Sequence, residues 1–170
     1  MDTLWVLFAL CRAVSAGAAA LLFGASAMLA LGGSPRLGTA AEAALRPALL
    51  RIAAVGLVAT LCLLPLQAAS IAGDWRAMLD GDMLDTVTLQ TRYGQAWVLR
   101  ALCAAAVLGV ALGLRPGRPS WLAGPAAVAL APLAFSGHAA MHAGGWGLAH
   151  ALNDYLHVLA AAFRLGSLPV

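Results

Sequence analysis

The sequence has little charge and no lysine at all. Only 10% of its 170 residues are charged, and the net charge of +3 comes entirely from arginine. An ordinary soluble domain carries about 25% charged residues. The arginines form no basic cluster, so the charge pattern does not indicate a nucleic-acid partner. The sequence also lacks a nucleotide-binding glycine loop, a nucleophile elbow and an HExxH motif, and we therefore expect no enzymatic activity.

Cysteine is scarce as well. Cys11, Cys62 and Cys103 each lie inside an apolar run, and an odd number without a regular spacing is not a disulfide framework. Each is compatible with the role of a small buried hydrophobic residue. The alternative is that they are soft ligands for a monovalent metal.

Apolar residues dominate the chain, at 62% of the sequence, and they come in long unbroken runs. A chain of this size cannot bury so much apolar surface in one small core, whereas a membrane-spanning helix needs about 20 such residues. We therefore predict an all-α polytopic transmembrane helix bundle in a lipid bilayer, forming a single domain over residues 1–170. Only Asp2 precedes the first run, which lacks the positive segment of a secretory signal. The prediction is four full spans plus a fifth that ends with the chain: residues 4–31, 49–72, 96–114, 121–141 and 150–170.

The distribution of arginine predicts the orientation of these spans. Arg36 and Arg46 lie between the first two spans, and Arg115 and Arg118 lie between the third and fourth. The segment 73–95 instead carries four aspartates against two arginines. By the positive-inside rule, the first and third loops face the cytoplasm. The N-terminus, the second loop and the fourth loop then face outside.

This topology places all four histidines in one outer layer. His138 and His142 end the fourth span, and His150 and His157 open the fifth. Neutral imidazole is a common metal ligand, and a thioether among imidazoles favours monovalent copper. Interfacial histidines also hydrogen-bond to backbone, and methionines also pack against lipid, so an ordinary role for each residue stays open. The predicted metal ligands are His138, Met141, His142, His150 and His157.

Ionisable groups within spans are costly and tend to be functional or paired. Arg12, Arg100 and Asp154 are such groups. Asp154 precedes His157 by three residues and could orient that imidazole, as carboxylates often do for metal-binding histidines. Pairing of Asp154 with Arg12 or Arg100 is the alternative.

Three segments resemble the copper-resistance D (CopD) family of inner-membrane proteins. Residues 91–100, TRYGQAWVLR, resemble its T-x-[FY]-G-x-x-W-x-x-R signature, and residues 136–140, SGHAA, resemble a second motif. Residues 154–162, DYLHVLAAA, resemble its D-x-x-H-x-x-A segment. The first span, with Arg12 and Gly24, is similar to the opening helix of the family.

The resemblance covers the whole chain but only the N-terminal part of such a protein. It implies copper transport or copper tolerance, with a periplasmic copper-binding partner of the CopC type. It also assigns importance to His138, His157, Asp154, Arg12 and Arg100, whereas the sequence topology alone indicates His142 and His150. One departure is the segment 163–166, FRLG, where the family has a W-x-G pattern.

Two alternative functions remain at this point. Histidines on two neighbouring helices of a bundle are also how haem is clamped, which would make the chain a membrane electron carrier of the cytochrome b type. The other alternative is a structural assembly subunit that binds no ligand. The metal content of the purified protein would separate these possibilities.

Overall fold

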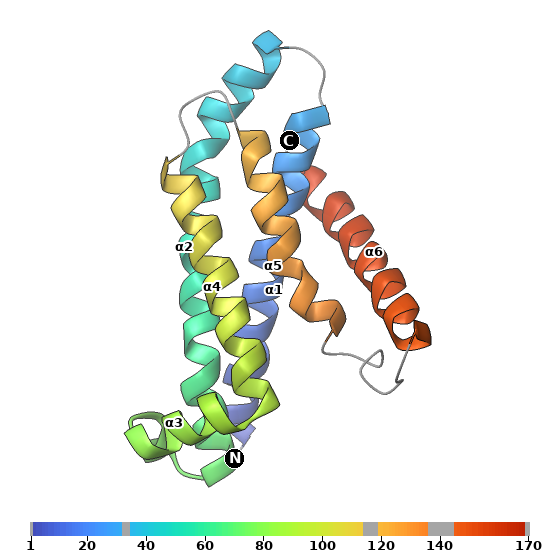
Figure 1. Ribbon diagram of the computed structural model, residues 1–170. Coiled ribbons are helices and arrows are strands. Elements are labelled where there is room, and N and C mark those ends of the chain that lie inside the picture. Colours follow the sequence, from blue (N-terminus) through green and yellow to red (C-terminus); the bar gives the residue numbers. More distant parts are fainter. Residues whose placement is uncertain (1, 32–34, 114–118, 136–144, 169–170) are drawn as a thin grey trace.

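The computed structural model describes residues 2–31, 35–113, 119–135 and 145–168, and these parts of the chain are all helical or in short turns (Figure 1). The elements in order are α1 (Asp2–Leu31), α2 (Pro35–Ala72), the 3-10 turn η1 (Trp75–Met78), α3 (Gly81–Gln90), α4 (Arg92–Gly113), the 3-10 turn η2 (Pro119–Leu122), α5 (Ala123–Phe135) and α6 (Gly145–Ser167).

Helix α1 is the centre of the bundle, with α2, α5 and α6 packed around it (Figure 1). Small residues make this close packing possible. A Cβ added to Gly56 of α2 would lie only 2.8 Å from Cβ of Ala18 in α1. Such small-residue contacts let helix backbones approach closely in a membrane, where packing and hydrogen bonds rather than water exclusion drive association.

Helix α6 meets α1 at a pair of glycines. A Cβ added to Gly24 would lie 2.6 Å from Cα of Gly166, and one added to Gly166 would lie 2.6 Å from Cα of Gly24. No side chain fits between the two backbones at this crossing. Gly166, which belongs to the segment that departs from the family pattern, is therefore needed for α6 to dock on α1.

Hydrogen bonds from aromatic side chains join α4 to α2. Trp97 donates from Nε1 to the Thr60 carbonyl oxygen at 2.7 Å, and the Tyr93 hydroxyl lies 3.3 Å from the Leu63 carbonyl oxygen. Both carbonyls belong to the part of α2 that precedes Pro65, an internal proline without an N–H. The indole and phenol groups therefore link α4 to α2 close to Pro65, where the backbone hydrogen bonding of α2 is interrupted.

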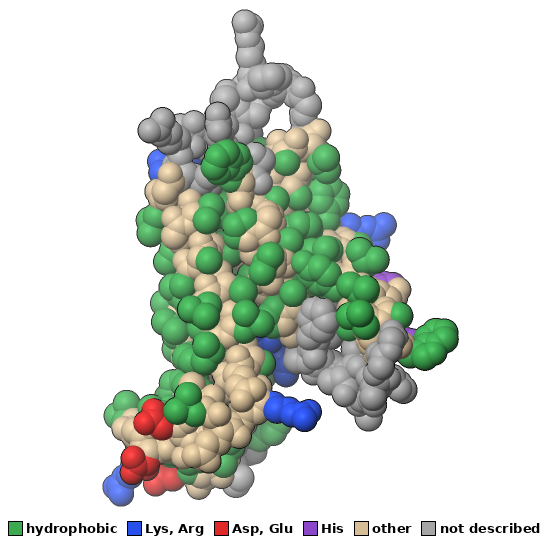
Figure 2. Space-filling view, viewed as in Figure 1, with side chains coloured by type: hydrophobic (Ala, Val, Ile, Leu, Met, Phe, Trp, Pro, Cys, Tyr) green, Lys and Arg blue, Asp and Glu red, His purple; other side chains and the backbone are tan. Residues whose placement is uncertain are grey.

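The segment between α2 and α4 closes one end of the bundle. Gly73 adopts φ +70°, a conformation that favours glycine, and ends α2. Asp74 and Asp80 then accept backbone N–H groups at the starts of η1 and α3. Capping therefore accounts for two of the four aspartates of this segment, and Figure 2 shows acidic side chains gathered at this end.

Three helices are long and apolar enough to cross a membrane: Thr3–Leu31, Ala44–Ala72 and Arg92–Gly113. They agree with the first three predicted spans, although α2 already begins at Pro35, so the predicted loop containing Arg36 and Arg46 is helical. On the face seen in Figure 2, apolar side chains are spread over the length of the bundle, as expected for a protein in lipid.

The predicted count of four full spans and a fifth is not confirmed. Helix α5 has 13 residues, shorter than the roughly 20 that a span needs, and its predicted continuation enters residues 136–144, outside the described part. Helix α6 has 23 residues and begins at Gly145, five residues before the predicted start. It is long enough to span a membrane but more polar than the three candidate spans.

Candidate functional site

The predicted metal ligands are only partly within the described structure. His138, Met141 and His142 lie outside the described residues. His150 and His157 lie on α6, and both are exposed. Among the described residues, no group of three His, Cys, Asp or Glu side chains is close enough to hold one metal ion.

The two described histidines lie on the side of α6 that faces away from the bundle. The packed side of α6 is marked by the buried residues Ala151, Ala162 and Gly166. His150 and His157 are seven residues apart, about two helical turns, so they share a side. At roughly 100° per residue, His157 lies about 140° around the helix from Ala162. The histidines therefore do not point into the core between α1, α5 and α6.

The imidazole of His157 is oriented by its own helix. Its Nδ1 atom lies 2.8 Å from the carbonyl oxygen of Asn153. A carbonyl oxygen only accepts, so Nδ1 carries the hydrogen and donates it. In the neutral ring, Nε2 then has the free lone pair, which is the form that binds a metal.

This arrangement differs from the predicted partnership of Asp154 with His157. A backbone carbonyl, and not the carboxylate, engages Nδ1 of His157. The carbonyl four residues earlier lies along the helix within reach of the ring nitrogen, and Asp154, three residues before His157, is half-buried. Asp154 remains a predicted supporting residue, but it does not fix this tautomer.

Arg12 lies on α1 and Arg100 lies on α4. Arg12 is exposed and Arg100 is half-buried. Within the described part of the chain, neither forms an ion pair with a carboxylate, and Nε of Arg100 is buried without a hydrogen-bond partner. The predicted pairing of either arginine with Asp154 is therefore not present.

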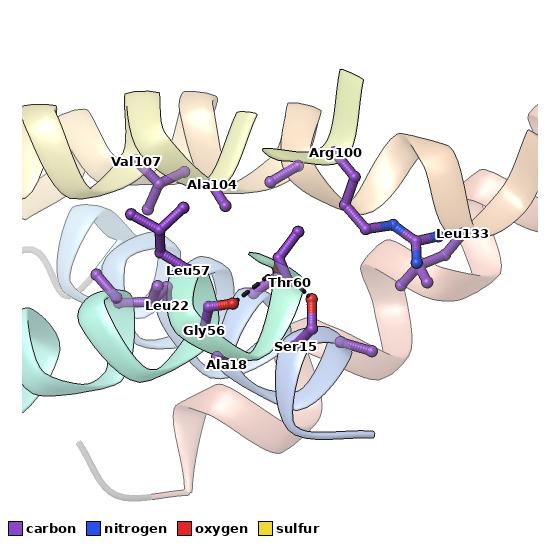
Figure 3. A pocket seen from close by; sticks show the side chains of 14 residues that line it. Ser15, Ala18, Leu22, Gly56, Leu57, Thr60, Arg100, Ala104, Val107 and Leu133 are labelled. Atoms are coloured by element: carbon purple, nitrogen blue, oxygen red, sulfur yellow. Dashed lines mark hydrogen bonds between the residues drawn. The ribbon is translucent and has the colours of Figure 1, made fainter. Parts of the chain in front are cut away.

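Arg100 instead lines a small cavity between α1, α2, α4 and α5 (Figure 3). Its guanidinium extends towards Leu133 of α5 (Figure 3). The cavity measures about 30 Å³, which is room for about one water molecule.

Two hydroxyl groups in this cavity were not anticipated from the sequence. Ser15 Oγ and Thr60 Oγ1 are buried and lie 2.6 Å apart (Figure 3). The Thr60 hydroxyl donates to the Gly56 carbonyl oxygen at 2.8 Å, so Ser15 donates to Thr60. Both residues are small and sit in apolar runs, and only the register between α1 and α2 brings them together.

These apolar helices, with their small-residue contacts and a few interhelical hydrogen bonds, define a polytopic helical membrane protein. Comparison with known proteins identifies its family. The chain belongs to the copper resistance protein D-like family, because residues 1–148 match the N-terminal domain of that family.

A curated relative supports this assignment. The "Copper resistance protein D" of Pseudomonas syringae pv. tomato is 35% identical over 130 residues, which cover 72% of this chain and 41% of that protein. The chain therefore spans less than half the length of this relative. No solved structure matches the chain. The matched domain ends at residue 148, so His150, Asp154 and His157 lie beyond it.

Proposed function

We propose that the chain takes part in copper transport or copper tolerance across the bacterial inner membrane, with a copper site at its outer face. The observation that carries this proposal is the match to the copper resistance protein D-like N-terminal domain. The proposed ligands are drawn from the predicted set: His138, Met141, His142, His150 and His157. Copper is the cargo of this protein and not a fixed cofactor.

Among the described residues, His157 has the geometry that best fits a copper ligand. Its Nδ1 donates to the Asn153 carbonyl, which leaves Nε2 as the metal-binding atom, and its side chain is exposed. Imidazole and thioether groups are neutral ligands, and a site built from them favours monovalent over divalent copper because the softer ion tolerates sulfur. The half-buried carboxylate of Asp154, on the same helix, would offset part of the positive charge of the ion.

The proposed orientation puts the N-terminus and the segment containing η1 and α3 outside. This proposal rests on the arginine content of the alternate loops. The segment is acidic through Asp74, Asp80, Asp82 and Asp85, all exposed. An acidic outer surface would attract a cation or a basic surface on a periplasmic copper-binding protein of the CopC type.

The haem-carrier alternative has less support. The family comparison concerns copper resistance, and the two described histidines lie on the outward side of a single helix. Haem ligation by two histidines needs side chains that project towards each other.

The test is copper(I) binding to the purified full chain, measured with a competing chromogenic chelator under reducing conditions. We expect His157→Ala to lower the copper affinity at least tenfold. Leu156→Ala is the matched control, because Leu156 is the exposed neighbour on the same helix and has no ligand atom. Equal copper affinity in both variants would refute the role of His157. An absorption spectrum of the same samples would detect haem, and a Soret band lost in His157→Ala would favour the cytochrome alternative.

A further inference from the structure

Arg100 places a positive charge inside the bundle. It follows Arg92, the first residue of α4, by eight residues, which is about 12 Å along the helix axis. This helix is long and apolar enough to cross a membrane. The side chain of Arg100 is half-buried, and its Nε atom is buried without a hydrogen-bond partner. Guanidinium stays protonated in proteins, so a charge at this depth needs a partner that offsets it.

Among the residues that the structure describes, no carboxylate lines the cavity that Arg100 enters. The chain has seven acidic side chains. Four of them are exposed on the segment between α2 and α4: Asp74, Asp80, Asp82 and Asp85. Asp154 lies on α6, which does not contribute to the cavity lining.

The two remaining acidic residues lie on helices that line the cavity, but far along them. Asp2 precedes Ser15 on α1 by thirteen residues, about 20 Å along the axis. Glu42 precedes Thr60 on α2 by eighteen residues, about 27 Å. The charge of Arg100 therefore has no carboxylate within reach in the described part of the bundle.

Two hydroxyl groups share the cavity with Arg100. Ser15 is 8% exposed and Thr60 is 1% exposed. Figure 3 shows them on α1 and α2, whereas Arg100 reaches the cavity from α4. Thr60 donates to the Gly56 carbonyl oxygen, and Ser15 donates to Thr60. Because hydroxyl hydrogens rotate, Ser15 can turn its hydrogen to another acceptor while the bond from Thr60 to Gly56 stays intact.

We propose that this cavity binds one small monovalent anion, such as chloride, between the Arg100 guanidinium and the Ser15 hydroxyl. The anion would accept from both groups in charge-assisted hydrogen bonds, which are stronger than the neutral bond that Ser15 gives up. A water molecule would also accept from Nε of Arg100, but it brings no negative charge. In a site of low dielectric constant, that charge is the larger contribution.

The size of the cavity selects the class of anion. Its volume of about 30 Å³ has room for about one water molecule. Chloride is only slightly larger than water, whereas phosphate, sulfate and organic acids are too large. The lining near Arg100 includes the small apolar residues Ala104 and Ala129, which offer no competing polar group.

This site goes beyond the proposed function and does not depend on it. The described histidines His150 and His157 lie on α6, outside the cavity, so copper is not needed for the anion to bind. The anion would connect Ser15 of α1 with Arg100 of α4, and it would bind the folded bundle only. Binding to the folded state alone raises stability as the ligand concentration rises.

The test is the chloride dependence of unfolding by SDS, measured on the full chain in micelles. Sodium chloride replaces sodium gluconate at constant ionic strength, so general screening is unchanged, and gluconate is too large for the cavity. We expect the SDS fraction at half-unfolding to rise with chloride and then to saturate. Arg100→Gln should abolish this rise. Arg92→Gln is the matched control, because it removes an exposed arginine of the same helix and should keep the rise.

A third variant keeps the charge and removes only the hydroxyl donor. Ser15→Ala should raise the chloride concentration needed for half of the effect about tenfold, since one charge-assisted hydrogen bond is lost. Equilibrium dialysis with radioactive chloride should find one bound ion in each native chain.

Two results would overturn the site directly. Equal unfolding of the native chain in chloride and gluconate would mean that the cavity holds only water, and equal chloride responses of Arg100→Gln and Arg92→Gln would mean that the effect comes from the surface. If Arg100→Gln does not fold, Ser15→Ala decides: a chloride response and a bound chloride content equal to those of the native chain reject the site.

Discussion

The glycine crossing between α1 and α6 predicts a large effect from a single methyl group. In Gly24→Ala the new Cβ would meet Cα of Gly166 at 2.6 Å and N of Gly166 at 2.8 Å, and it would also run into the Ala162 carbonyl oxygen. Ordinary van der Waals contact begins near 3.4 Å, so the two helices must separate by about 0.8 Å. The atoms in the way are backbone atoms, so no side-chain rotation relieves the clash.

We expect Gly24→Ala to lower the free energy of unfolding by about 1–3 kcal/mol, the usual cost of overpacking a close contact. The matched control is Gly17→Ala on the same helix, where the new Cβ meets nothing within 4 Å. Alanine forms helix more readily than glycine by about 1 kcal/mol in water, so Gly17→Ala should be neutral or slightly stabilising.

The assay is loss of helical circular dichroism during titration of the micelle-solubilised protein with SDS. Gly166→Ala addresses the same crossing, so the double variant Gly24→Ala/Gly166→Ala should cost less than the sum of the single changes, since helices that have already separated have room for a second methyl group. If Gly24→Ala unfolds at the same SDS fraction as Gly17→Ala, the close approach of α1 and α6 is wrong.

Four further predictions concern the bundle, its orientation and its copper affinity. A double-mutant cycle with Ser15→Ala and Thr60→Val should give a coupling of about 0.6–1.7 kcal/mol, the range measured for hydrogen bonds between membrane helices; no coupling in SDS unfolding would contradict the 2.6 Å contact. Trp97→Phe removes the donor to the Thr60 carbonyl and should destabilise by roughly 1 kcal/mol, whereas a stability equal to that of the native chain would show that the indole N–H contributes nothing. In a background without the native cysteines, Gly38→Cys should react with an impermeant thiol reagent only after the cells are opened, and labelling in intact cells would invert the proposed orientation. Copper affinity should decline on acidification, because both nitrogens of a protonated imidazole carry hydrogen, and an affinity independent of pH would point to thioether or thiolate ligands.

Much of the fold follows from one property of the sequence. Runs of about 20 or more apolar residues need a helix to satisfy their backbone hydrogen bonds in lipid, and the first three predicted spans correspond to helices that are long and apolar enough to cross a membrane. The fourth predicted span enters residues 136–144, outside the described part, and stays a prediction. Helix α6 carries a polar side, so its start at Gly145 could not be read from hydropathy.

The candidate site was predictable in its residue types but not in its arrangement. The sequence indicated His150 and His157 on one helical side from their spacing alone, and their exposure on α6 agrees with this. It did not indicate that this side faces away from the bundle, since the direction depends on which residues of α6 contact α1. It also offered Asp154 as a partner of His157, with Arg12 or Arg100 as the alternative, and did not indicate that Nδ1 of His157 lies 2.8 Å from the Asn153 carbonyl oxygen.

The sequence by itself determined that this protein is helical, that it resides in a membrane and that it resembles the copper-resistance D family, because composition, run length and short motifs are local properties of the chain. Only the tertiary structure decided which helices touch. Gly24 meets Gly166, Ser15 meets Thr60, and Arg100 turns into a cavity with no carboxylate partner among the described residues. These outcomes depend on the register and crossing of helices far apart in the chain. The register depends on close contacts between small residues. These residues come from several helices, so no single stretch of sequence contains all of them.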